Sequence, residues 1–154
     1  MYLDFSLEDE DELDLSGFEL GVIAIGSSPQ ECVQNRGGQE CMIFLSITDL
    51  LSEYRCFLMK TDRQHVFSAA DCSFQIKFTK IESSNLKIEA GGRTDFRVVC
   101  AMVSRLEFAN QLYNKSTEFS QLISGKMAPN AVAYRDLEQA LQEFKSFKSG
   151  GGIS

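Results

Sequence analysis

The chain has 154 residues, of which 44% are apolar and 24% are charged. Such a chain is long enough to form one domain and too apolar to be disordered throughout. Its formal net charge of −7 argues against direct binding to nucleic acid or to an anionic membrane, and it has no apolar run long enough to span a membrane. We therefore expect a single α+β domain over residues 1–149 and a disordered, glycine-rich tail over residues 150–154.

The N-terminal segment carries seven acidic side chains without a base among them. These seven account for the whole net charge of −7. Because a concentrated negative patch attracts basic partners, we predict a partner-binding surface here. A solvated run that only keeps the protein soluble is the alternative. The candidate binding residues are Asp4, Glu8, Asp9, Glu10, Asp11, Glu12 and Asp14.

The first predicted elements form a hairpin with this acidic segment at its tip. Tyr2 to Leu7 alternates apolar and polar residues, which predicts a strand with one buried face. A second strand is expected within Leu13 to Gly26, built on Phe18 and the apolar residues after it. Glu8 to Glu12 is expected to be an exposed turn, because adjacent like charges disfavour pairing in a sheet. The Pro, Gly, Asn and Ser residues of Ser27 to Gln39 indicate a long loop.

The central segment predicts a strand, a helix and then further strands. Met42 to Leu45 is an apolar run of strand length. From Ile47 to Leu58, apolar residues recur at helical spacing, and Ser46 followed by Asp49 is typical of a helix start. The pattern then changes to alternation, which predicts two strands, His65 to Ser68 and Cys72 to Phe78.

Two more strands and two helices complete the expected fold. Leu86 to Glu89 and Phe96 to Val103 extend an antiparallel meander, and the continuous apolar run in the second predicts a more buried strand. Ser104 to Glu107 fits a capping box for a helix that Gly125 ends, and a final helix begins near Val132. The expected architecture is an antiparallel, meander-rich sheet of about six to seven strands. An inserted helix follows the third strand, and two C-terminal helices pack on one face.

The residues that enzymes and metal sites use are scarce. The chain has one histidine, His65, and five cysteines without a CxxC pair, so we expect no metal site, no cofactor and no catalysis. The odd number of cysteines, and an acidic N-terminus unlike a signal peptide, indicate a reduced protein of the cytoplasm. An enzyme with Cys32 or Cys41 as nucleophile is an alternative. Ordinary exposed positions on the outer face of the meander are expected for Lys77, Lys80, Lys87, Arg93 and Arg97.

Three stretches resemble small immunity proteins encoded beside bacterial polymorphic toxins, including the contact-dependent inhibition, Rhs and wall-associated types. They are MIFLSITDLLSEY (residues 42–54), HVFSAADCSFQIKFTK (residues 65–80) and DLEQALQEFKSF (residues 136–147). The helix predicted between Arg105 and Ser124 departs from the pattern of that family.

The resemblance implies a cytoplasmic inhibitor without activity of its own, which binds the catalytic domain of a cognate toxin and covers its active site. Many such toxins are basic and nuclease-like, so the acidic segment would speed association. The implied partner is a protein, without direct contact to nucleic acid or a membrane, and the free chain is expected as a monomer or weak dimer. A secretion chaperone, which binds an extended effector segment through a groove or sheet edge, is the main alternative.

Overall fold

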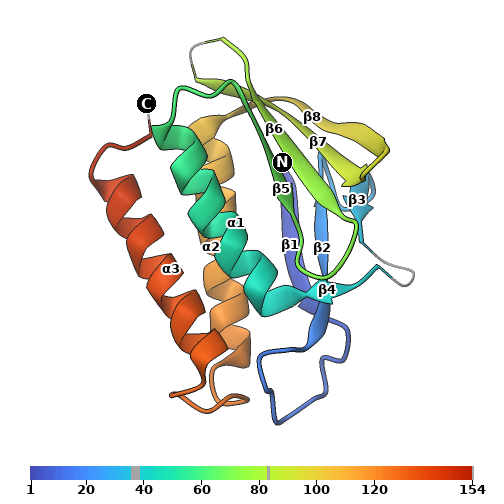
Figure 1. Cartoon of the computed structure of the whole chain (residues 1–154), viewed down its shortest axis with the longest axis vertical. Helices are drawn as coiled ribbons and strands as arrows, with labels where there is room; N and C mark the ends of the chain where they lie inside the picture. Colours follow the sequence, from blue (N-terminus) through green and yellow to red (C-terminus); the bar gives the residue numbers. More distant parts are fainter. Residues whose placement is uncertain (36–38, 83, 154) are drawn as a thin grey trace.

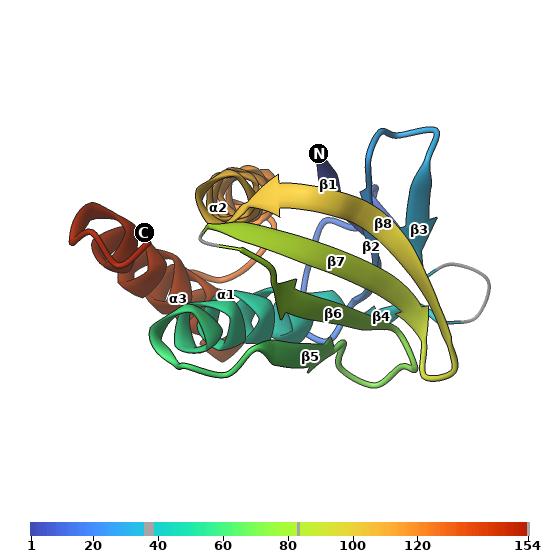
Figure 2. The same cartoon turned by 90° about the horizontal axis from the view of Figure 1, so that it is seen from above.

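The structure is a computed structural model of the chain, and it describes residues 1–35, 39–82 and 84–153. These residues form eight strands and three helices in an α+β arrangement. Figures 1 and 2 show the helices gathered on one side of the molecule and the strands on the other. The strands form two antiparallel sheets of four strands each. The expected α+β class and antiparallel pairing are thus confirmed, whereas the expected single sheet of about six to seven strands matches this layout only in part.

The first sheet begins with the predicted hairpin. β1 (Tyr2–Leu7) pairs antiparallel with β2 (Leu20–Gly26), and the acidic segment lies in the connection between them. Along β1, Leu3, Phe5 and Leu7 are buried, while the residues between them are half-buried. The alternation in the sequence therefore identified both the strand and its core-facing side.

Two short strands complete the first sheet along the other edge of β2. β3 (Cys32–Gln34) pairs with the end of β2, and β4 (Cys41–Met42) pairs with its beginning. β3 lies within Ser27 to Gln39, which the sequence predicted as a loop, and residues 36–38 of that segment lie outside the described residues. Pairing with β2 overrides the turn signature of these residues. Because β3 and β4 both precede α1, the helix expected after the third strand follows the fourth.

The second sheet is the predicted meander. Its strands lie side by side in chain order, and each pairs antiparallel with the next. The side chains of Phe67, Ile76 and Ile88 are fully buried on its inner face. The four strands are β5 (Gln64–Ser68), β6 (Gln75–Lys80), β7 (Asn85–Gly92) and β8 (Asp95–Ser104).

β8 is less buried than its apolar run predicts. It forms an edge of the second sheet, and the side chains of Val98 and Met102 are 52% and 68% exposed. Val99 and Val103 are buried. A continuous apolar run is typical of a strand covered on both faces, whereas β8 contributes one face to the core and leaves the other in solvent.

α1 (Ile43–Met59) begins earlier than the sequence predicted. The strand expected over Met42 to Leu45 is wrong, because the apolar run after Met42 is the first turn of the helix and continues its buried face. Ser46 does not start the helix. It is buried within it, and its hydroxyl oxygen accepts a hydrogen bond of 2.9 Å from the N–H of Ala70.

α2 (Arg105–Ile123) follows β8 directly. α3 (Val132–Ser149) is the helix farthest from the strands in Figure 1. The side-chain oxygen of Ser104 accepts from the N–H of Glu107 at 3.0 Å, which confirms the predicted cap of α2. Gly125 has a φ of +100°, as expected after a helix end. α2 contacts β1 and β8, whereas α3 packs on α1 and α2, so the expected packing of both C-terminal helices on a sheet is wrong for α3.

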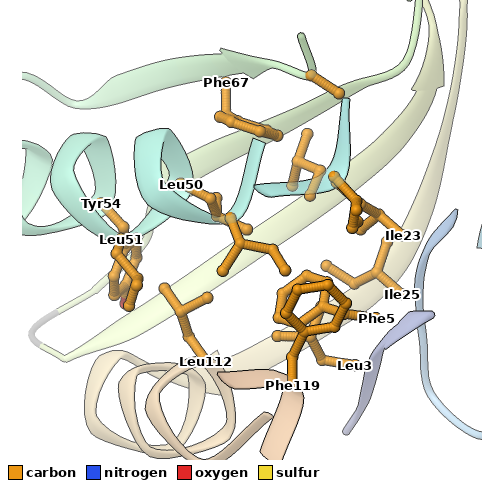
Figure 3. Close-up of a cluster of buried hydrophobic side chains, with 14 of the residues drawn as sticks. Leu3, Phe5, Ile23, Ile25, Leu50, Leu51, Tyr54, Phe67, Leu112 and Phe119 are labelled. Atoms are coloured by element: carbon orange, nitrogen blue, oxygen red, sulfur yellow. The ribbon is translucent and has the colours of Figure 1, made fainter. Parts of the chain in front are cut away.

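The core lies between the helices and both sheets. Figure 3 shows side chains of β1 and β2 pointing toward those of α1 and α2, among them Leu3, Phe5, Ile23, Ile25, Leu50, Leu51, Leu112 and Phe119. Tyr54 of α1 is fully buried at one end of this core, where its ring packs on Phe78 of β6 and Phe108 of α2. These contacts hold elements that are distant in the sequence around α1.

Lys80 at the end of β6 stabilises the C-terminal end of α1. Its ammonium donates to the carbonyls of Phe57 (2.8 Å) and Lys60 (2.6 Å), where a cation complements the helix dipole. Burial lowers the pKa of Lys80. Its predicted place on the outer face of the meander is therefore wrong. Lys77 of β6 forms a salt bridge with Glu89 of the neighbouring β7, and Lys87 of β7 forms one with the same carboxylate along its own strand.

The glycine-rich residues after α3 continue from its last turn. The N–H groups of Gly150, Gly151 and Gly152 donate to carbonyls of residues 146–148, and Ile153 packs against the core. Ser154 lies outside the described residues. The disorder expected for residues 150–154 stays a prediction.

Candidate functional site

Six of the seven predicted binding residues lie together in one exposed connection, Glu8 to Asp14, which we call the acidic loop. All six of its carboxylates are exposed. Within the described residues none of them takes part in a salt bridge, and the carboxylate of Asp9 accepts a hydrogen bond from the N–H of Asp11. The loop therefore presents a concentrated negative charge to solvent.

Asp4, the seventh predicted residue, is set apart from the acidic loop. It lies in the middle of β1 and is half-buried. Its carboxylate is 3.8 Å from the ammonium of Lys115 in α2, and the hydroxyl of Tyr2 also donates to it. Because this charge is already paired within the protein, we assign Asp4 to the contact between β1 and α2.

The acidic loop is held against the connection between α2 and α3. Leu15 is buried directly after the loop, and its N–H donates to the carbonyl of Lys126 at 2.8 Å. The ammonium of Lys126 in turn donates to the carbonyl of Glu10 at 2.6 Å. In Figure 1 the loop and this connection lie at the same end of the molecule. The loop backbone is thus attached to the fold while its carboxylates remain in solvent.

A tight turn follows the acidic loop and is organised by Glu19. The carboxylate of Glu19 accepts hydrogen bonds from the hydroxyl of Ser16 and from the N–H of Gly17, both at 2.8 Å. Burial alone would raise the pKa of Glu19, but these hydrogen bonds outweigh it, and the pKa lies below its usual value. Gly17 has a φ of +100°, and a Cβ there would meet the Cβ of Ala133 at 2.5 Å. The turn therefore packs directly on the first turn of α3.

Replacing Glu19 with Gln should destabilise this turn, by about 1 kcal/mol in the free energy of unfolding at pH 7. Because folding lowers the pKa of Glu19, its contribution is present above the unfolded pKa of about 4.3 and is lost as the pH falls through the folded value. Urea unfolding should thus show a difference between wild type and Glu19→Gln that is large at pH 7 and shrinks below about pH 4.

The matched control for this experiment is Glu12→Gln, because Glu12 is an exposed carboxylate of the neighbouring acidic loop. Glu12→Gln should leave the unfolding free energy nearly unchanged at both pH values. Equal effects of the two variants would contradict the role assigned to Glu19.

An apolar pocket of about 390 Å³ opens beside this turn. Of the eleven described residues that line it, Asp136 alone is charged. Phe18 and Val132 stand at the pocket with 74% and 71% of their surface exposed. The sequence predicted Phe18 as part of the second strand, which is wrong, because β2 begins at Leu20. The lining residues are Ser16, Gly17, Phe18, Met42, Phe44, Leu45, Thr48, Ala131, Val132, Ala133 and Asp136.

The residues considered for nucleophilic catalysis make other contacts. The imidazole of His65 is 2.6 Å from the carboxylate of Glu53 and stacks on the ring of Phe57. The thiol of Cys32 donates to the carbonyl of Pro29 at 3.3 Å. Burial raises the pKa of Cys41, so its thiol stays protonated at neutral pH and is a poor nucleophile. These contacts give no support to a Cys–His pair.

No family model, curated protein or solved structure matches the chain. In the parts of the chain that the structure describes, no three His, Cys, Asp or Glu side chains converge as a metal site requires. No helix within residues 1–35, 39–82 and 84–153 combines the length and the apolar character needed to cross a membrane. The acidic loop and the adjoining apolar pocket are the features from which a function can be argued.

Proposed function

We propose that this chain is an immunity protein that binds a basic, nuclease-like toxin domain and neutralises it by covering its active site. The observation that supports this function is the acidic loop, whose six exposed carboxylates form no salt bridge with the described residues. The ammonium of Lys126 reaches the loop but donates to the backbone carbonyl of Glu10, so one cation stands beside six carboxylates. The excess of like charge favours a partner that brings positive charge.

The loop is suited to a nucleic-acid-binding partner. Such a partner carries Lys and Arg side chains that normally contact phosphates, and a row of carboxylates offers the same cations an alternative anionic surface. Long-range attraction of this kind acts mainly on the association rate constant and weakens as salt is added, because the Debye length is only about 8 Å at physiological ionic strength.

Neutralisation is tested by co-expression in a bacterial host. The toxin candidate is the C-terminal domain encoded by the adjacent reading frame, expressed from an inducible promoter. We expect this domain to arrest growth and the chain to restore growth by forming a one-to-one complex in which the toxin's nuclease activity is lost. A complex with full nuclease activity, or failure to restore growth, would refute the proposal.

The role of the acidic loop is tested by neutralising Glu10, Asp11 and Asp14 as Gln, Asn and Asn. In surface plasmon resonance with the toxin domain, the association rate constant should fall about tenfold at low salt and lose most of its salt dependence, with little change in the dissociation rate constant. The matched control neutralises three exposed acids elsewhere, Asp62, Glu82 and Asp95. An equal reduction in both triple variants would show that net charge, and not the loop, sets the rate.

A second candidate function, binding of an extended effector segment by a secretion chaperone, is favoured by the edges of the two sheets. β3 and β8 each end a sheet, and residues of both border a cavity of about 580 Å³. Exposed strand edges accept additional strands. A chaperone would bind an unfolded effector segment and release it active, whereas an immunity protein binds a folded domain and abolishes its activity.

A further inference from the structure

We infer that the apolar pocket takes a bulky apolar side chain of a protein partner, from a segment in which that side chain is flanked by arginine or lysine. This inference rests on the proposed function and adds the contact that holds the complex together. Electrostatic attraction to the acidic loop brings the partner close, but it does not supply the buried contact that slows dissociation.

The size and lining of the pocket favour a bulky apolar occupant. Its volume of about 390 Å³ is within the range of roughly 300–1,000 Å³ typical of binding cavities. Phe44 forms a buried wall of the pocket, while Phe18, Leu45 and Val132 are exposed at it. Covering these three side chains removes apolar surface from water, which is favourable in proportion to the area covered.

The charges around the pocket favour a cation beside that apolar side chain. Asp136 of α3 is exposed at the pocket, and the acidic loop ends two residues before Ser16, another lining residue. The carboxylate of Glu19 is already engaged by the turn. A basic residue next to the inserted side chain would therefore face Asp136, and a second one on its other side would face the acidic loop.

The pocket is also open along the helices, which gives room for a segment longer than one residue. A second cavity of about 210 Å³ lies between α1 and α3 and shares Thr48 and Asp136 with the pocket. Its other lining residues include Ser52, Gln139 and Glu143, which are polar. The carboxylate of Glu143 is already paired with Arg55 at 2.6 Å, so Asp136 is the acid of these two cavities that the inference uses. The pocket and the second cavity thus combine one apolar position with a polar continuation, and they match a segment with one large apolar side chain beside a basic residue.

The chain contains no tryptophan, so a single tryptophan in a peptide reports on this pocket without interference. The probe is the peptide acetyl-GRRWRRG-amide, and GEEWEEG with the same ends is its charge-reversed control. At low salt we expect the basic peptide to bind with a blue-shifted emission, at least tenfold more tightly than the acidic peptide. Equal binding of the two peptides would overturn the inference, because the pocket would then select apolar character alone.

Filling the pocket provides the structural test. Thr48→Phe places a ring in the pocket, and Thr117→Phe in α2 is the matched control, because both threonines are half-buried and their hydroxyls donate to the carbonyl four residues earlier. Thr48→Phe should weaken peptide binding at least tenfold and abolish the blue shift, whereas Thr117→Phe should bind like wild type. Unchanged binding by Thr48→Phe would overturn the inference.

A second pair of variants keeps the test valid if Thr48→Phe does not fold. Val132→Ser removes an exposed apolar side chain at the pocket, and Val98→Ser does the same on β8. We expect Val132→Ser alone to weaken binding of the basic peptide, about threefold. Equal binding by both variants would contradict the inference.

The same Thr48→Phe variant separates this inference from the proposed function. If Thr48→Phe still neutralises the toxin domain with an unchanged dissociation rate constant, the pocket inference fails and the immunity function stands. If the wild-type chain binds the basic peptide in the pocket but neutralises no toxin, the inference stands and the immunity function fails.

Discussion

Replacing Tyr54 with Ala is expected to lower the free energy of unfolding by about 4 kcal/mol, within the range for truncating a large buried aromatic side chain. Domains of this size are stabilised by about 5–15 kcal/mol in total, so the variant should be close to the limit of folding. Urea unfolding followed by circular dichroism measures the effect, with the midpoint shifted to lower urea concentration.

The reason for this large effect is that Tyr54 joins three helices and a strand. The centroid of its ring lies 4.7 Å from the ring centroid of Phe108 in α2 and 5.2 Å from that of Phe78 in β6. The ring of Phe144 in α3 stacks on it as well. Its hydroxyl donates to the carbonyl of Arg105 at 3.0 Å. Truncation leaves a cavity between rigid elements that cannot collapse into it, and the cavity adds to the lost transfer free energy.

Two further variants separate the ring from its hydroxyl. Tyr54→Phe keeps the ring and removes only the hydrogen bond to Arg105, so it should cost about 1 kcal/mol. Tyr113→Ala truncates a half-buried tyrosine of α2 and should cost clearly less than Tyr54→Ala. Equal losses for Tyr54→Ala and Tyr113→Ala would contradict the central packing role of Tyr54.

The sequence predicted those parts of the fold that depend on neighbouring residues. The alternation of Tyr2 to Leu7 identified β1, and the helical spacing that includes Leu50, Leu51 and Tyr54 identified α1. The cap of α2 at Ser104 was also correct, because it is formed within four residues. Periodicity and capping depend on residues close in the sequence, so they can be predicted without knowing which helices and strands pack together.

The sequence failed where distant segments decide the structure. The apolar run after Met42 fits a strand or a helix equally well, and only its packing selects the helix. Likewise, a pattern of strands does not reveal that β5 to β8 form a sheet separate from β1 and β2. Alternation shows which face of a strand is buried, but the partner of that strand is set by tertiary packing.

In the candidate site, too, the sequence predicted the feature built from neighbouring residues and missed the one built from distant segments. The acidic loop is one continuous segment, so the sequence located six of its charges directly. The lining of the apolar pocket includes Phe18, Leu45 and Val132, which come from three separate segments, and no local pattern connects them. The only hint in the sequence was an apolar residue, Phe18, close after the acidic loop, and the strand pattern that follows made it look like part of the strand.

Asn35 is a further residue whose role the sequence concealed, because asparagine in a loop-like segment indicates a turn. Its side chain is 1% exposed and lies between the two places where β3 and β4 pair with β2. The side-chain oxygen accepts from the N–H of Ile23 at 2.6 Å, and the amide nitrogen donates to the carbonyls of Gly21 and Gln39. This one side chain thereby continues the hydrogen bonding along the edge of β2.

Asn35→Leu is expected to lower the free energy of unfolding by about 3 kcal/mol, because the fully buried N–H of Ile23 loses its acceptor and two carbonyls lose a donor. Asn114→Leu is the matched control, since Asn114 is exposed on α2, and it should change stability by less than about 0.5 kcal/mol. Native-state hydrogen exchange gives a local readout: the Ile23 amide should lose protection in Asn35→Leu beyond the global change in stability.

Asn35→Asp adds a pH dependence that a purely steric role would not produce. The aspartic acid keeps the acceptor for Ile23 and, when protonated, one donor, but its ionised form is buried beside the carbonyls of Gly21 and Gln39. Its folded pKa should therefore be raised, and the loss of stability relative to wild type should increase as the pH rises from 4 to 7. A pH-independent difference, or an equal one for Asn114→Asp, would contradict the assigned hydrogen bonds.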